Sequence, residues 1–180
     1  MTRTILTYAD YAALPDDGRR YELHAGELSM TPAPGTRHQV ALARLFDILL
    51  HHVDSRGLGL VLFAPLDCIL SDTTVLQPDI VFVDTQYLSR ISERGIEGAP
   101  TLAVEVSSPS TERIDREAKL EFYARHGVAN YWIVDPAARE IEARVLEGET
   151  YTLAGRVSAA LPGALPPFPD LVIDPVSPRS

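Results

Sequence analysis

Two carboxylate residues of this chain lie where a strand is predicted to be buried. Glu105 lies in the middle of LAVEVS, and Asp79 follows Pro78 at the start of DIVFV. An ionised carboxylate in such a strand is costly unless it has a partner. If the two strands are neighbours, both carboxylates meet at one point. Two carboxylates and several waters form a site that suits Mg²⁺, with Mn²⁺ as a second possibility. The alternative for Asp79 is a turn-capping role after the proline.

Lys119 is the only lysine among the 16 basic residues of the chain. It falls on a helix predicted over 111–127, with Thr111 as N-cap and Gly127 as the C-terminal stop. At about 100° per residue it lies at the edge of the packed face of this helix. A lysine beside a metal-bound water can orient that water and stabilise charge on a phosphate. The alternative is a simple i,i+4 contact with Asp115, worth a few tenths of a kcal/mol.

The histidines and aromatic residues are assigned structural roles. We interpret His38 as a surface residue, with a contact to phosphate as the alternative. His51 and His52 are placed at the carbonyl end of a long helix, where a protonated imidazole is favoured. The core is predicted to contain the aromatic side chains, among them Tyr123, Tyr131 and Trp132.

The elements that would position these groups alternate between strands and helices. The longest predicted helix covers 36–57 and ends at Gly57. A hairpin is predicted within 19–34 around Ala25 and Gly26. Further predicted elements are a short helix at 7–15, a loop or broken helix at 85–100, and strands at 59–64, 67–70, 79–83, 101–107, 130–135, 140–147 and 150–154. The pattern predicts an α/β (α+β) domain with a mixed sheet flanked by helices.

The composition sets limits on the domain organisation and on the partners. The 180 residues predict one domain, 1–180, with a core at about 19–155. The Pro-rich tail, 161–180, is expected to run over the surface, with a short edge strand at 170–173 as an option. The net charge of −9 argues against non-specific coating of nucleic acid. A single cysteine, Cys68, fits a reducing compartment, and no apolar run reaches the length of a membrane span. We therefore expect a soluble cytoplasmic protein without a membrane partner.

Several segments resemble the bacterial Uma-two family of restriction endonucleases, within the PD-(D/E)XK nuclease-like superfamily. They are LTYADYAALPDDGRRYELHAGEL, QPDIVFV, LAVEVSSPST and DREAKLEFYARHGVANYWIVDP, followed by the Pro-rich tail. The resemblance implies a restriction-endonuclease-like core with Asp79 and Glu105 as metal ligands. In the usual superfamily pattern a lysine lies two residues after the glutamate, where this chain has Ser107. In the Uma-two family the resemblance implies that the lysine has moved to the next helix, which points to Lys119. It also implies Glu22 as an extra ligand or water-orienting group.

The leading hypothesis is therefore a Mg²⁺-dependent endonuclease that hydrolyses DNA phosphodiester bonds. A homodimer is expected, because two sites related by a two-fold axis cut both strands of a duplex most easily. The alternative is a nuclease fold used as a binding or interaction module without meaningful turnover. The intact Asp79, Glu105 and Lys119 favour the enzyme, whereas the acidic composition favours the module.

Overall fold

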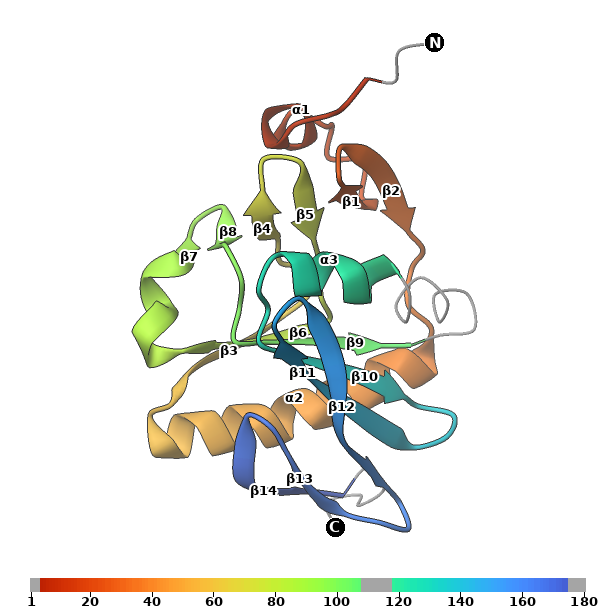
Figure 1. Cartoon of the computed structure of the whole chain (residues 1–180). Coiled ribbons are helices and arrows are strands. Elements are labelled where there is room, and N and C mark those ends of the chain that lie inside the picture. The colour runs from red at the N-terminus through yellow and green to blue at the C-terminus, as the bar shows by residue number, and fades with distance from the viewer. Residues whose placement is uncertain (1–3, 108–117, 175–180) are drawn as a thin grey trace.

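A six-stranded sheet, here termed the central sheet, carries both strands that were singled out for their carboxylates (Figure 1). The computed structural model describes residues 4–107 and 118–174. Strands β9 and β10 are parallel and the other neighbours are antiparallel. The predicted α/β fold with a mixed sheet is confirmed. The strand order is β12 (Thr150–Ser158), β11 (Glu140–Glu147), β10 (Asn130–Asp135), β9 (Leu102–Val106), β6 (Ile80–Asp84) and β3 (Gly59–Phe63).

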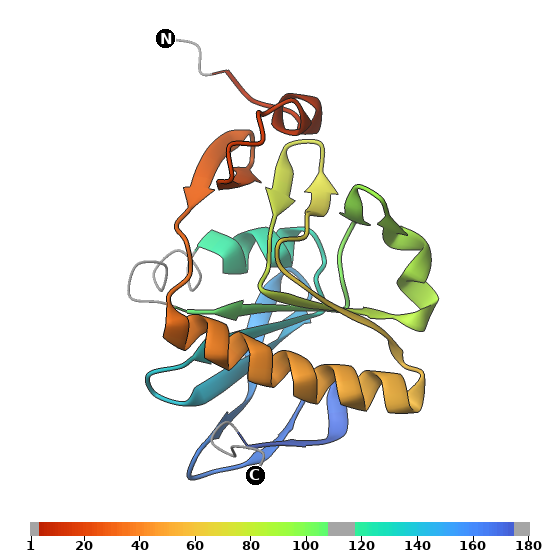
Figure 2. The same ribbon diagram turned by 180° about the vertical axis from the view of Figure 1, so that it is seen from behind.

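Helix α2 (Thr36–Arg56) covers one face of the central sheet (Figure 2). Its apolar residues recur at helical spacing, so that one stripe of the helix is buried against the sheet. Gly57 ends the helix with a φ of 62°, a left-handed conformation in which glycine is favoured. The predicted helix and its C-terminal stop are confirmed.

The opposite face of the central sheet is covered by α3 (Leu120–Arg125) and by a second six-stranded sheet. The second sheet contains β2 (Glu27–Thr31), β1 (Arg20–His24), β5 (Thr74–Leu76), β4 (Cys68–Ser71), β8 (Gly95–Glu97) and β7 (Ile91–Ser92). The predicted hairpin at Ala25 and Gly26 is confirmed, and both residues have positive φ, as a tight two-residue turn requires. The predicted start of the 111–127 helix lies outside the described residues.

Two segments of the first part of the chain remain, one at 7–15 and one at 85–100. Helix α1 (Tyr8–Ala12) agrees with the helix predicted at 7–15, and Thr7 caps it. The segment predicted as a loop or broken helix consists of the 3₁₀ helix η1 (Thr85–Arg90) followed by β7 and β8. None of the helices within 4–107 and 118–174 is long and apolar enough to cross a membrane.

The Pro-rich tail contains the short edge strand that was considered at 170–173. It forms a hairpin of β13 (Gly163–Leu165) and β14 (Phe168–Ile173). Phe168 is buried, its ring centroid lies 5.0 Å from that of Phe82, and the indole of Trp132 donates a hydrogen bond to the carbonyl of Pro166. Three residues of the tail, Leu165, Phe168 and Ile173, belong to the core cluster beneath α2. Their burial could not be predicted, because their irregular spacing shows no strand period.

Candidate active site

The register of two neighbouring strands places the two predicted carboxylates opposite each other. In β9, Val104 packs into the cluster beneath α2, whereas Ala103 packs into the cluster on the opposite face. Glu105 therefore faces the second sheet and α3. Because Ile80 of β6 pairs with Val104 in an antiparallel register, Asp79 lies opposite Glu105. The predicted neighbourhood of the two strands is thus confirmed.

Asp79 is only 5% exposed and is held by two hydrogen bonds. Its Oδ2 atom accepts one from the backbone N–H of Val106 at 2.8 Å and lies 3.0 Å from Nε2 of His38. Among the described residues, no hydrogen bond reaches Oδ1. The interpretation of His38 as a surface residue is wrong, since its side chain comes from the first turn of α2 and is largely covered by the site.

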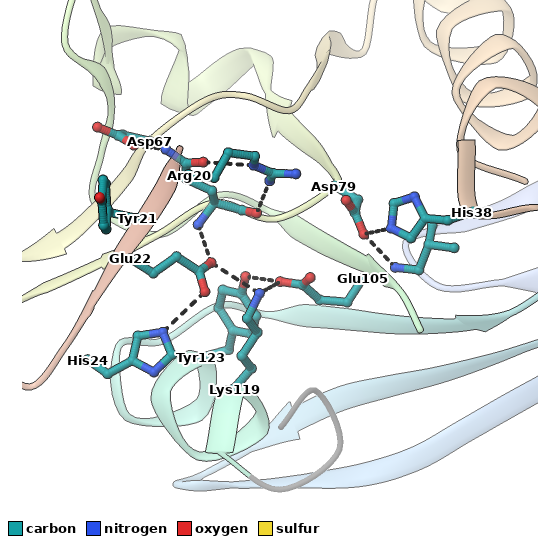
Figure 3. Close-up of polar contacts among 12 residues, drawn as sticks. Arg20, Tyr21, Glu22, His24, His38, Asp67, Asp79, Glu105, Lys119 and Tyr123 are labelled. Atoms are coloured by element: carbon teal, nitrogen blue, oxygen red, sulfur yellow. Dashed lines mark hydrogen bonds and ion pairs between the residues drawn. The ribbon is translucent and has the colours of Figure 1, made fainter. Parts of the chain in front are cut away.

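Glu105 is 3% exposed, and its carboxylate forms hydrogen bonds with other side chains of the protein. Its Oε1 atom accepts hydrogen bonds from the ammonium of Lys119 at 2.9 Å and from the hydroxyl of Tyr123 at 2.7 Å (Figure 3). Both donors lie at or near the start of α3, where Lys119 itself is buried. A cation and a hydroxyl therefore offset the cost of keeping this carboxylate in a strand.

Glu22 joins this group from β1 of the second sheet. Its Oε1 atom lies 3.1 Å from the ammonium of Lys119 and accepts a hydrogen bond from the backbone N–H of Gln77 at 2.7 Å. Its Oε2 atom lies 3.2 Å from Nε2 of His24. Burial by itself raises the pKa of Glu22, but the Lys119 ammonium and these hydrogen bonds hold that pKa well below its usual range. Lys119 thus contacts one carboxylate from each sheet, Glu105 of the central sheet and Glu22 of the second sheet.

The four predicted site residues divide into two contact groups. Lys119 contacts both Glu22 and Glu105, whereas Asp79 contacts His38 and makes no hydrogen bond or ion pair with the other three. The backbone of β9 joins the groups, because the N–H that holds Asp79 belongs to the residue after Glu105. Asp115, considered as a partner of Lys119, lies outside the described residues.

The comparisons with known proteins concern the family and the fold. The model of the Uma2 family, described as "Putative restriction endonuclease", matches residues 8–175. The chain belongs to the Uma2 family. A crystal structure of "a putative nuclease belonging to DUF820" from Anabaena variabilis ATCC 29413 superposes with a TM-score of 0.76 at 18% sequence identity, covering 94% of this chain and 95% of that one. This similarity shows a shared restriction-endonuclease-like fold. No curated protein matches the sequence.

The donor set of this Uma2 protein fits a hard divalent cation. Asp79 and Glu105 are both buried carboxylates, and Asp79 keeps one oxygen without a hydrogen bond to the described residues. Mg²⁺ is usually held in proteins by one or two carboxylates together with waters and substrate phosphates. The part of the chain that is described contains no group of three or more His, Cys, Asp or Glu side chains placed to hold a metal. A site with two carboxylates is the kind that Mg²⁺ accepts.

Sequence reasoning missed two residues that contact the predicted ligands. Tyr123 was assigned to the core, yet its hydroxyl contacts Glu105 as well. A signal was available, since Tyr123 follows Lys119 by four residues and so shares its helix face. His38 offered no comparable signal, because 41 residues separate it from Asp79 and only the packing of α2 brings them together.

The lowered pKa of Glu22 predicts a specific loss of stability in acid. A carboxylate whose pKa is lower in the folded state stabilises the protein above its ordinary pKa and loses this contribution as the pH falls towards the folded value. Between these two values the free energy of unfolding should change by up to about 1.4 kcal/mol per pH unit through this group. We expect Glu22→Gln to remove this dependence in urea unfolding measured from pH 6 to pH 3.

Glu121→Gln is the matched control, because Glu121 forms only an exposed ion pair with Arg125. This variant should keep the pH dependence of the wild type. An unchanged slope in Glu22→Gln would show that the Lys119–Glu22 contact does not lower the pKa of Glu22.

Proposed function

We propose that this Uma2 protein is a Mg²⁺-dependent endonuclease that hydrolyses phosphodiester bonds of DNA with a site of the PD-(D/E)XK type. Asp79 and Glu105 would hold the metal, Lys119 would assist the attacking water and the phosphate, and Glu22 would support Lys119. The observation that carries this proposal is the buried position of Asp79 opposite Glu105, with Lys119 at 2.9 Å from the glutamate. The fold of the whole chain, taken as one nuclease domain, supports it.

The environment of each side chain suits its proposed role. Bound Mg²⁺ would stabilise charge on the phosphate and lower the pKa of a coordinated water. His38 and the N–H of Val106 hold one oxygen of Asp79, which leaves the other oxygen available as a ligand. Tyr123 and Lys119 fix the Glu105 carboxylate. The Lys119 ammonium contacts Glu22 and Glu105, and it could donate a hydrogen bond to the water or to a phosphate oxygen.

Ser107 supports the transfer of the lysine role to α3. Ser107 occupies the strand position of the usual superfamily lysine, but its hydroxyl donates a hydrogen bond to the carbonyl of Val134 at 3.0 Å. This side chain is therefore committed to the strand backbone. Lys119 reaches the same glutamate from the neighbouring helix, so the ammonium is supplied from a different element.

Two further parts of the proposal concern assembly and location. A homodimer with a two-fold axis would present one site to each strand of a duplex. A reducing, cytoplasmic location agrees with Cys68, a free and fully buried thiol whose pKa burial raises above its usual range.

One observation favours a second candidate, an interaction module without turnover. Lys119 forms ion pairs with both Glu22 and Glu105, and the N–H of Gln77 and the hydroxyl of Tyr123 donate further hydrogen bonds to them, so protein groups alone give each carboxylate its partners. A protein that has no chemistry to perform could keep such a cluster for stability. Binding of a divalent cation separates the two candidates, because only the enzyme requires it.

The test is cleavage of duplex, single-stranded and branched DNA with Mg²⁺ or Mn²⁺, together with calorimetric titration of each ion. We expect the wild type to bind the ion and to cleave at least one substrate. Asp79→Asn should lower the cleavage rate by about 10²-fold or more, because a neutral amide is a much poorer ligand for Mg²⁺.

Asp84→Asn is the control at the other end of β6, where Asp84 accepts a hydrogen bond from the N–H of Gln86. This variant should retain both cation binding and cleavage. If the wild type neither binds a divalent cation nor cleaves any of these substrates, the interaction module becomes the better account.

A further inference from the structure

A groove of about 740 Å³ lies on the α2 side of the central sheet, between the first half of α2 and the end of β10. Its lining includes the apolar residues Leu45, Val134 and Ile141. Arginine side chains of α2 and of the turn after β10 also line it. None of the four candidate site residues lines this groove, so it is a separate feature of the surface.

The arginines of the groove differ from the other described arginines. Eleven arginines lie within 4–107 and 118–174, and eight of them make a hydrogen bond or an ion pair. The three that make neither with any described residue are Arg37, Arg44 and Arg139, and all three line the groove. The chain has a net charge of −9, yet the three guanidinium groups without a partner among the described residues lie in one groove. Such a cluster indicates an anionic ligand.

The carboxylates that line the same groove have other partners. Asp135 accepts hydrogen bonds from the backbone N–H groups of Ala137 and Ala138 at 2.8 and 2.9 Å. Glu140 lies 3.7 Å from the guanidinium of Arg156, and Asp174 has a partner as well. The lining thus contains three arginines and three carboxylates, and the arginines are the charged groups of the groove that have no partner among the described residues.

The groove and the candidate active site lie at the same end of the central sheet. Arg37 precedes His38, which contacts Asp79. Val134, in the groove wall, accepts a hydrogen bond from the N–H of Ser107, two residues after Glu105. A chain-like ligand that leaves the site across the start of α2 would therefore enter the groove directly.

The spacing of the arginines suits a nucleic acid backbone. Arg37 and Arg44 are seven residues apart on α2, a rise of about 10.5 Å. Phosphates of one DNA strand follow each other at about 3.4 Å along the helix axis, so this distance spans about three of them. The N-terminus of α2 adds backbone N–H groups, because its cap residue, Gly35, provides no side chain to bind them.

We propose that this groove binds the sugar–phosphate backbone of the nucleic acid that flanks the scissile bond, through Arg37, Arg44 and Arg139. The inference rests on the proposed function for the identity of the polyanion. The apolar side chains that line the groove can accept sugar or base surface. The groove thereby supplies substrate affinity that the acidic chain as a whole does not provide.

The test compares the wild type with a triple variant, Arg37→Gln, Arg44→Gln and Arg139→Asn. Asparagine is used at 139 because the φ of Arg139 is 54°, a conformation that asparagine tolerates. Binding of a labelled duplex is measured in EDTA over a range of salt concentrations, so that cleavage does not contribute. We expect Kd to rise at least tenfold. The plot of log association constant against log salt concentration has a negative slope. Its magnitude should decrease by about 2 to 3, because each lost phosphate contact removes about 0.9.

The charge-matched control is the triple variant Arg56→Gln, Arg94→Gln and Arg125→Gln, whose arginines already have partners elsewhere. An equal loss of affinity in both triple variants would overturn the inference, because net charge alone would then explain it. Unchanged binding in the groove variant of an enzyme that cleaves DNA would overturn the inference and leave the proposed function intact. Groove-dependent binding without cleavage at any metal concentration would support the groove and contradict the enzyme. A wild type that binds no DNA would contradict both.

Discussion

Replacing Glu105 by glutamine is expected to abolish saturable Mg²⁺ binding and to lower the DNA cleavage rate by about 10³-fold, because it removes the charge of one of two metal ligands. Glutamine has nearly the same shape, and its amide oxygen can still accept hydrogen bonds from Lys119 and Tyr123. The fold should therefore persist, and near-ultraviolet circular dichroism should match that of the wild type. Calorimetric titration of Mg²⁺ and a plasmid cleavage assay measure the two effects.

Glu142 provides a matched control for this experiment. It is also a strand glutamate that is 3% exposed, and it pairs with Arg144 and Arg156 rather than with the site. Glu142→Gln is expected to reduce stability while leaving cation binding and cleavage in place. If Glu105→Gln retains Mg²⁺ binding with the affinity of the wild type, Glu105 is not a ligand and the metal site lies elsewhere.

The parts of the site that follow from local periodicity could be predicted from the sequence. A period of two in LAVEVS placed Glu105 on one face with Ala103 and Ser107, and in DIVFV it placed Asp79 with Val81 and Val83. That the two strands are neighbours was only a condition of the sequence argument, and the structure supplies it. The helical wheel likewise placed Lys119 against the protein rather than in solvent. Each of these inferences depends on residues within a few positions of one another.

The parts that depend on packing between distant segments could not be predicted in this way. The contact of Glu22 with Lys119 requires a second sheet, and that sheet contains strands of only two to four residues at β4, β5, β7 and β8. Such strands are too short to show alternation. The resemblance to a known family supplied Glu22, whereas the contact between His38 and Asp79 came only from the docking of α2.

Replacing Lys119 by methionine is expected to reduce the stability of the protein and its turnover together. The change removes the cation that Glu22 and Glu105 share, and breaking a buried ion pair by removing one partner costs about 3–5 kcal/mol. The cleavage rate should fall by about 10²- to 10³-fold, because no ammonium remains beside the water and the phosphate. Urea unfolding at pH 7 and a cleavage assay at saturating Mg²⁺ measure these two losses.

Added Mg²⁺ then separates a catalytic lysine from one that only stabilises the fold. In the enzyme, a divalent cation bound at Asp79 and Glu105 replaces part of the lost positive charge, so Mg²⁺ should stabilise Lys119→Met more than it stabilises the wild type. The double variant Lys119→Met with Glu22→Gln should recover stability, because it removes one of the two carboxylates, yet it should not recover cleavage. If Mg²⁺ leaves the free energy of unfolding of Lys119→Met unchanged, the carboxylates do not form a cation site. Lys119 then has only a structural role, as the residue that connects the two sheets.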